Sequence, residues 1–321
     1  MIPFFDAHAD TIFRCIYEDK NLRENDLHID LIRSKQCAPY AQFFAIWTMT
    51  QVDSQKQSDH TFLPEQLYMG YVNSLERMKL EFEKNRDILQ HCKNAKDAKA
   101  AAAAGKISAF ISVEGAELLE CSEVRLIEAY KAGVRAVNLC WNNANLLCGS
   151  CIDEADRGLG AEGKSFVRCA QELGIIIDLS HASEPAFWDT IEVSLRPVMT
   201  SHSNSKVLCG HPRNLTDRQF KALIENGGIS GINLYSDFLS DSGADIEDVF
   251  AHVEHFMSLG GEKSVAIGSD FDGVERLPEG INGIEDICKL YELLLTRNYS
   301  EDLVRDIFYN NLMNFIEKAM N

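Results

Sequence analysis

The feature that most constrains the fold is a regular alternation of short strand-like runs with longer helix-like stretches. Eight runs rich in β-branched and aromatic residues have the length of β-strands. They are Ile2–Ala7, Gln42–Trp47, Ile107–Val113, Val134–Cys140, Gly174–Ser180, Pro197–Ser201, Gly228–Leu234 and Ser264–Ser269. Eight strands separated by helices indicate a (β/α)8 barrel, since an open doubly wound sheet more often has about five or six strands.

Helix-like stretches lie between the predicted strands and follow the last of them. They are Glu65–Lys84, Ala95–Ala104, Glu123–Ala132, Gly163–Leu173, Glu184–Ile191, Thr216–Glu225, Ile246–Leu259, Ile284–Leu295 and Glu301–Ala319. No linker, composition shift or internal repeat divides the chain. The sequence therefore predicts an α/β fold, a single (β/α)8 TIM barrel domain over residues 1–321, with insertions after the early strands and extra C-terminal helices.

Charge and composition limit the partners of such a barrel. Asp and Glu number 49 against 31 Lys and Arg, and the net charge of −18 repels phosphate backbones and anionic lipid. The N-terminal run MIPFFDAHADTIF lacks the basic and apolar segments of a signal peptide, and no run approaches the roughly 20 apolar residues of a membrane span. We therefore expect a cytoplasmic protein that binds neither nucleic acid nor membrane.

The ten cysteines are scattered along the chain, and we expect reduced thiols. Cys148 and Cys151 form the only C-x-x-C pair, in a loop rich in Asn and Gly. Because no second pair stands at zinc-finger spacing, we interpret them as two loop thiols rather than as a redox or structural zinc site.

Residues that can bind metal follow most of the predicted strands. In a TIM barrel the C-terminal ends of the strands form the active site, so these side chains should converge. They are His8 and Asp10 after the first strand, Glu114 after the third, His181 after the fifth, His202 after the sixth, and Asp270 with Asp272 after the eighth. Because side chains alternate along a strand, His8 and Asp10 should point to the same face.

Three imidazoles with several carboxylates suit Zn²⁺, with manganese or cobalt as substitutes. A lone His near a strand more often has a structural role. Unrelated structural residues would not, however, all lie at the C-terminal ends of the strands, on the same end of the barrel. One ion is saturated by about three or four protein ligands, so five ligands predict two ions bridged by Glu114 and a water. Such a pair can generate hydroxide beside a polarised carbonyl, which is hydrolytic machinery.

The remaining candidates are expected to lie outside this site. Asp6 is interpreted as support for the ligands or as the start of a turn. The other histidines are expected to have surface or structural roles: His28, His60, His91, His211, His252 and His255.

Six motifs follow one another in a fixed order: FFDAHAD, SVEG, DLSH, TSHS, HPRN and GSDFDG, supported by HIDLIRSKQCAPYAQFFAIW and FYNNLMNFI. They span almost the whole chain, and in this combination they resemble the membrane dipeptidase family, the renal dipeptidase-like peptidase family M19. The resemblance implies an amidohydrolase-type barrel with two zinc ions. It also implies cleavage of dipeptides by a hydroxide between the two metals, often with tolerance for a D-residue at the C-terminal position. Barrels of this kind often pair, which makes a homodimer the oligomeric state to test.

Carried over residue by residue, the resemblance assigns His8 and Asp10 to the first zinc, Glu114 to the bridge, and His181 with His202 to the second zinc.

The resemblance also implies two residues that act on the substrate. Arg213 would form a bidentate contact with the free carboxylate of a dipeptide, which Lys would match poorly. Asp270 would take a proton from the bridging water and pass it to the departing amine. Asp272 is its rival, although it could instead support the loop.

One position departs from the family pattern. After the fourth strand many members read L-T-H, with a His that holds the substrate or its developing oxyanion, whereas this chain reads NLCWNNAN with Trp141 there. An indole N–H can donate a hydrogen bond but cannot carry imidazolium charge. We therefore expect Trp141 to shape the substrate pocket, with neutral donors from Asn142, Asn143 and Asn145.

Two other functions remain open at this point. A different amidohydrolase-type reaction, such as lactone, cyclic amide or phosphoester hydrolysis, is the first, because fold and metals do not fix the substrate. Many two-metal relatives of that wider class use a carboxylated Lys on strand 4, and this chain has none there. A non-catalytic metal-binding scaffold is the second, although such a scaffold would need neither Asp270 nor Arg213.

Overall fold

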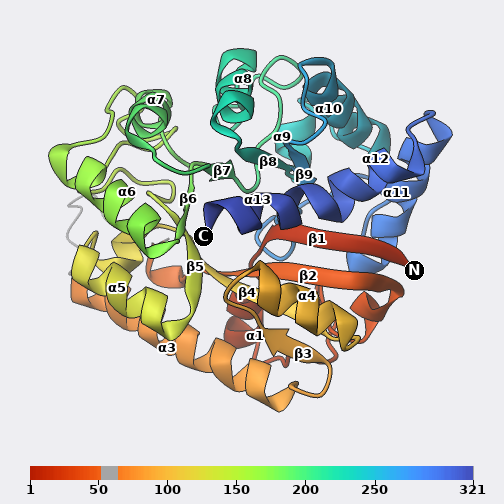
Figure 1. Cartoon of the computed structure of the whole chain (residues 1–321), viewed down its shortest axis with the longest axis horizontal. Helices are drawn as coiled ribbons and strands as arrows, with labels where there is room; N and C mark the ends of the chain where they lie inside the picture. Colours follow the sequence, from red (N-terminus) through yellow and green to blue (C-terminus); the bar gives the residue numbers. More distant parts are fainter. Residues whose placement is uncertain (52–63, 321) are drawn as a thin grey trace.

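The computed structural model describes residues 1–51 and 64–320 and contains a closed barrel of parallel strands surrounded by helices (Figure 1). In order around the barrel, the strands are β1 (Ile2–Ala9), β2 (Cys37–Ile46), β4 (Ile107–Val113), β5 (Val134–Asn138), β6 (Ile176–Asp178), β7 (Met199–Thr200), β8 (Ile229–Ile232) and β9 (Val265–Ile267). Asp6 of β1 pairs with Ile267 of β9, which closes the ring. The predicted (β/α)8 barrel is confirmed.

A further strand, β3 (Leu89–His91), is a correction to the sequence prediction. It lies outside the ring and pairs in parallel with the first residues of β4, from Ile107 onward. Only Leu89 of its three residues is buried, so the run carries no alternating pattern from which a strand could be recognised.

Strands β6 and β7 end sooner than their apolar runs suggested, because the Asp178 side chain accepts hydrogen bonds from the backbone N–H groups that follow them. The runs continue to Ser180 and Ser201, but β6 ends at Asp178. Oδ1 of Asp178 accepts the backbone N–H of Ser180 and of Ser201, both at 3.0 Å. The backbone therefore leaves the sheet there and turns toward the end of the barrel.

Helices cover the outside of the barrel. They are α1 (Thr11–Tyr17), α3 (Pro64–Lys84), α4 (Ala95–Ala103), α5 (Glu123–Ala132), α6 (Ala161–Leu173), α7 (Glu184–Val193), α8 (Asp217–Asn226), α9 (Ser236–Leu239), α10 (Ile246–Ser258), α11 (Ile287–Thr296), α12 (Glu301–Arg305) and α13 (Asn311–Ala319).

Two of these helices, α1 and α9, were not predicted, and the predicted helix Glu301–Ala319 is not uniform. A π-helical segment at Asp306–Asn310 separates α12 from α13. The segment buries Ile307, Phe308 and Tyr309 in sequence, and the wider turn accommodates these neighbouring side chains against the barrel.

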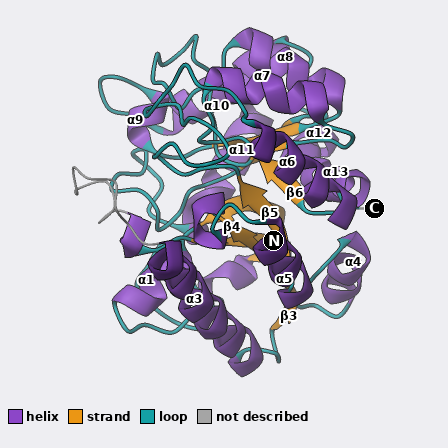
Figure 2. Cartoon of the chain, turned by 90° about the vertical axis from the view of Figure 1, so that its left-hand side faces the viewer, coloured by secondary structure: helices purple, strands orange, loops and turns teal. Residues whose placement is uncertain are grey.

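One end of the barrel is closed by packing. The rings of Phe5, Phe43 and Phe110 stack inside it with centroids 5.0–5.8 Å apart. Helix α13 packs against this interior cluster through side chains such as Leu312 and Phe315. Figure 2 shows α13 and the C-terminus on one side and many of the long loops on the other. The opposite end, where the strands finish, is thus left to form a site.

No helix among the described residues is both long enough and apolar enough to span a membrane.

Candidate metal centre

Four of the five predicted ligands meet around the carboxylate of the fifth, Glu114. Its Oε1 lies 2.8 Å from His181 Nε2 and 3.6 Å from His202 Nε2. Its Oε2 lies 3.6 Å from His8 Nε2, which is 3.4 Å from Asp10 Oδ2. The two oxygens of Glu114 therefore face two separate groups of ligands, one on each side.

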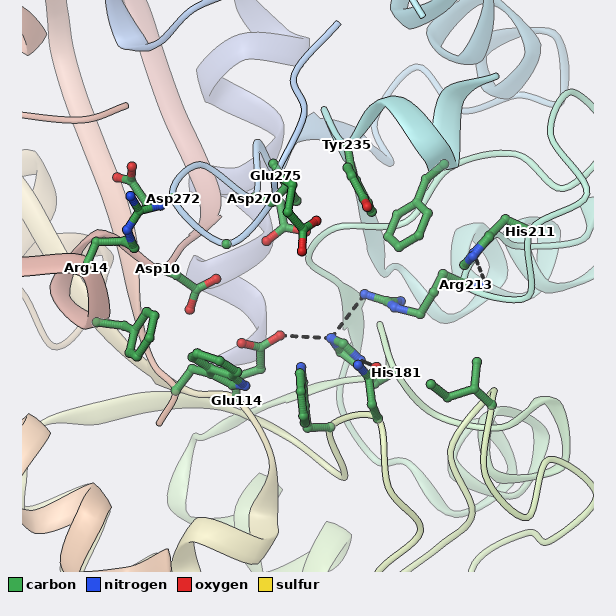
Figure 3. A pocket seen from close by; sticks show the side chains of 18 residues that line it. Asp10, Arg14, Glu114, His181, His211, Arg213, Tyr235, Asp270, Asp272 and Glu275 are labelled. Atoms are coloured by element: carbon green, nitrogen blue, oxygen red, sulfur yellow. Dashed lines mark hydrogen bonds and ion pairs between the residues drawn. The ribbon is translucent and has the colours of Figure 1, made fainter. Parts of the chain in front are cut away.

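Strand ends deliver these side chains to one place. His8 is the last residue but one of β1, Glu114 directly follows β4, and His181 and His202 follow the early ends of β6 and β7. Figure 3 shows Glu114 and His181 in the middle of the site, with Asp10 on one side and Arg213 on the other.

The atoms of this cluster fit divalent ions. Both ring nitrogens of His8 and Oδ1 of Asp10 are buried without a hydrogen-bond partner. Nε2 of His181 and Nε2 of His202 face each other at 3.1 Å. Because buried polar atoms are normally satisfied, the unpaired Nε2 of His8 and Oδ1 of Asp10, together with the facing nitrogens of His181 and His202, mark a cluster that can bind a cation.

Within the described part of the chain, Glu114 belongs to two groups of candidate ligands. His8, Asp10 and Glu114 offer ligand atoms within 4.8 Å of one another, and so do Glu114, His181 and His202. A third group, His8 with His202 and Asp270, overlaps both. Imidazole nitrogen and carboxylate oxygen are the donors that Zn²⁺ takes in catalytic sites.

Burial and mutual charge set the protonation of the cluster. Burial, reinforced by the charge of Asp10, raises the pKa of Glu114 to about 8. Burial alone would lower the pKa of His8, but the carboxylates of Glu114 and Asp10 outweigh it and raise this pKa above its ordinary value. Burial, followed by the nearby cationic groups, lowers the pKa of His181 and His202, so their imidazoles are neutral and available as ligands.

Asp270 lies beside the candidate metal ligands, and its hydrogen-bond partner Asn233 was not predicted from the sequence. Its Oδ2 accepts a hydrogen bond from Asn233 Nδ2 at 2.8 Å, while Oδ1 lies 3.9 Å from His8 Nε2. Burial raises the pKa of Asp270. Asn233 directly follows β8, the same strand-end position as the ligands, and this was the signal by which it could have been found.

Asp272, the rival of Asp270, is engaged elsewhere. Its Oδ2 accepts from Thr11 Oγ1 at 2.5 Å and its Oδ1 from the backbone N–H of His28 at 2.8 Å. It lines the same pocket, but these bonds tie the loop after β9 to α1, which matches the alternative of a loop-supporting residue.

Arg213 reaches the site from the loop after β7. One of its terminal nitrogens lies 3.1 Å from His181 Nε2, and the other is buried without a partner. The guanidinium lies 5.4 Å from the ring centroid of Phe238. A buried guanidinium with an unpaired nitrogen beside the candidate metal ligands can receive a carboxylate.

The ligands open into a cavity of about 520 Å³, large enough for a small peptide. Trp141 forms part of its wall. The centroid of its ring lies 5.2 Å from the ring centroid of Trp47 and 6.4 Å from that of His181. Asn142 also lines the cavity, and its Oδ1 lies 3.0 Å from His181 Nδ1.

Asn145 is not among the residues that line the cavity, which corrects the expectation that it supplies a donor there. Its Nδ2 donates to Glu117 Oε2 at 2.9 Å and to a backbone carbonyl, and its Oδ1 accepts two backbone amides of the same loop. Asn143 does not line the cavity either.

Some residues differ from their predicted place. His211 lines the cavity, although a surface or structural role was expected. Tyr235 and Glu275 line it too and were not predicted. Tyr235 directly follows the predicted strand Gly228–Leu234, whereas Glu275 lies in a loop, where no periodic signal marks it. His60 lies outside the described residues. The other four histidines bond to groups outside the ligand cluster: His28, His91, His252 and His255.

All ten cysteines are free thiols in the structure. Cys148 is buried, and Cys151 is partly buried.

Comparison with known proteins decides the family. All 321 residues match the family described as "Membrane dipeptidase (Peptidase family M19)". The chain belongs to this family. As an M19 metallo-dipeptidase it is a hydrolase, and the resemblance read from the strand-end motifs is confirmed.

The matches between this M19 dipeptidase and its relatives cover most of both chains. An uncharacterized dipeptidase of Schizosaccharomyces pombe is 32% identical over 281 residues, 84% of this chain and 67% of that protein. A metallo peptidase from Rhodobacter sphaeroides, solved with a phosphinate mimic of L-Ala-D-Ala, superposes with a TM-score of 0.90 at 25% identity over 99% of both chains. A solved M19 dipeptidase, dipeptidase AC, gives a TM-score of 0.87 at 26% identity, again over 99% of both.

Proposed function

We propose that this M19 dipeptidase hydrolyses dipeptides with a free C-terminal carboxylate, including those with a D-residue at the C-terminal position. The observation that carries the proposal is the Glu114 carboxylate, whose two oxygens face two separate ligand groups. We propose that His8 and Asp10 hold one divalent ion, that His181 and His202 hold a second, and that Glu114 bridges them. Zn²⁺ is the first choice for both.

Bound divalent ions would polarise the scissile carbonyl and lower the pKa of the attacking water. Asp270 is then placed to take the proton of that water on Oδ1, because its Oδ2 is held by Asn233. The water oxygen forms a bond to the carbonyl carbon, the C–N bond breaks, and Asp270 returns the proton to the departing amine. The raised pKa of Asp270 suits a group that must carry a proton between these steps.

Arg213 fixes the direction of the substrate. The guanidinium is 3.1 Å from His181 Nε2. A substrate carboxylate bound to it therefore places the neighbouring peptide bond close to the proposed metal ligands. The N-terminal residue then extends past Glu114 toward Asp10, on the opposite side of the site in Figure 3. The Rhodobacter sphaeroides peptidase was solved with a phosphinate mimic of the dipeptide L-Ala-D-Ala, which supports a dipeptide as the substrate here.

Trp141 shapes the pocket for a substrate side chain in this proposal. Its ring stands edge-on to Trp47, which is edge-on to Phe13, with centroids 5.2 and 4.5 Å apart. Such a row of rings offers an apolar surface and no charge for an oxyanion.

A substrate panel tests the proposal against its alternatives. The metal-loaded chain should hydrolyse L-Ala-D-Ala and other free dipeptides with a kcat/KM at least about 10²-fold above those for the matching amidated dipeptides, because one buried charge pair is lost. Dipeptides with a large apolar side chain should have lower KM values than Gly-Gly. Faster turnover of lactones, cyclic amides or phosphoesters would reject the proposal. Equal KM values for dipeptides with different side chains would show that Trp141 does not shape a side-chain pocket.

A further inference from the structure

One of the histidine ligands is hydrogen-bonded to a buried carboxylate through a serine. His202 directs Nε2 toward Glu114 and His181, and its other ring nitrogen, Nδ1, lies 2.7 Å from Ser201 Oγ. Ser201 Oγ in turn makes a very short hydrogen bond to Asp178 Oδ2. Asp178, Ser201 and His202 are each at most 1% exposed.

The direction of these hydrogen bonds follows from the surroundings of Asp178. Its Oδ1 accepts the backbone N–H groups of Ser180 and Ser201 and the hydroxyl of Ser180, at 2.7–3.0 Å. Every neighbour is thus a donor to the carboxylate, and the single hydroxyl proton of Ser201 goes to Oδ2. Ser201 Oγ is left as an acceptor, so the proton on the imidazole of His202 must be on Nδ1.

We propose that Asp178 and Ser201 are positioning residues that hold His202 in the tautomer whose Nε2 lone pair faces the metal centre. This inference rests on the proposed metal site. A metal-binding imidazole commonly donates its other N–H to a group that fixes its orientation, and losing that group costs about 10- to 100-fold in metal affinity or activity.

The other two histidines of the site lack this arrangement. Nδ1 of His8 is buried without a partner, and Nδ1 of His181 meets the neutral amide oxygen of Asn142 at 3.0 Å. Among the three, only His202 has an Nδ1 that is connected, through a serine, to a carboxylate. The relay defined by Asp178 and Ser201 therefore singles out this ligand.

Asp178→Asn offers a sharp test because it should reverse the relay. The two backbone N–H groups at Oδ1 require an acceptor, so the amide oxygen of the variant occupies that position and its NH2 faces Ser201 Oγ. The hydroxyl of Ser201 then donates to Nδ1 of His202 at 2.7 Å rather than to Ser180 Oγ, which is farther away at 3.2 Å. The imidazole proton moves to Nε2, where it blocks metal binding. Ser201→Ala only removes the partner and leaves both tautomers open.

The experiment measures Zn²⁺ affinity by chelator competition on the full chain. We expect Ser201→Ala to weaken the binding by about 10-fold and Asp178→Asn by about 100-fold. Ser230→Ala is the matched control, since Ser230 is a fully buried barrel serine that bonds to Thr200 Oγ1 and a backbone carbonyl rather than to a histidine. It should bind Zn²⁺ as the wild type does.

A second measurement separates this role from a general loss of structure. Long-range ¹H–¹⁵N spectra of the metal-free protein should show His202 as the Nδ1–H tautomer in the wild type and as the Nε2–H tautomer in Asp178→Asn. An unchanged tautomer, or Zn²⁺ affinity in Asp178→Asn within about 3-fold of the wild type, overturns the relay, since the expected loss is 10- to 100-fold. Wild-type protein that binds no Zn²⁺ contradicts the proposed function instead.

Discussion

Replacing Asp270 by Asn should lower kcat for a free dipeptide by about 10²- to 10⁴-fold, the range for loss of a general acid–base group. The amide keeps the shape of the carboxylate, and its oxygen can still accept from Asn233 Nδ2. The ligands on both sides of Glu114 are untouched. Elemental analysis should therefore find the wild-type metal content, while steady-state kinetics shows the loss in kcat.

Asp272→Asn is the matched control for this variant. Both oxygens of Asp272 already accept hydrogen bonds, one from Thr11 and one from the backbone of His28. The main effect of the change should therefore be a lower thermal unfolding temperature, with only a small effect on kcat. A large loss of kcat in Asp272→Asn together with a near-normal Asp270→Asn would transfer the proton-carrying role to Asp272.

Replacing Arg213 by Ala should lower kcat/KM for free dipeptides by about 10²- to 10³-fold, the size expected for a buried charge pair that loses one partner. Arg213 is 5% exposed and has an unpaired terminal nitrogen, so little solvent competes for the substrate carboxylate. Arg213→Lys should recover only part of the loss, because an ammonium cannot form the bidentate contact. Both variants are measured on the same dipeptide by steady-state kinetics.

The amidated form of that dipeptide supplies the control for Arg213. Without a carboxylate to bind, it should react with the wild type and with Arg213→Ala at nearly the same low kcat/KM. If Arg213→Ala reduces the rate for both forms equally, the residue acts on the metal ligand His181 rather than on the substrate.

The barrel and its ligand cluster could be predicted because both follow from simple periodicities. Eight short runs rich in β-branched and aromatic residues predict the strands, and the rule that barrel strands end at one rim places His8, Glu114 and His202 together. The pairing of β1 with β9 and the contacts of Glu114 agree with that prediction.

Features that depend on backbone departing from regular structure could not be predicted. Asp270 has a positive φ of 59°, a conformation that the loop after β9 imposes and that no periodic pattern signals. Asp178 lies inside an apolar run, where its hydrogen bonds end β6 and reach across to Ser201. Phe238 of α9 and Glu275 of the loop after β9 line the cavity from segments beyond the strand ends, so only the folded chain brings them there.

The most direct test of the account is a metal titration of the hydrolysis of L-Ala-D-Ala. Chain stripped with a chelator should be inactive, and stepwise addition of Zn²⁺ should restore the rate until about two ions are bound per chain, as expected for two ligand groups sharing Glu114. Glu114→Ala should fail to reach either the metal content or the rate. Full activity with one bound ion per chain would contradict the bridged pair, and hydrolysis by the metal-free chain would contradict the metal centre itself.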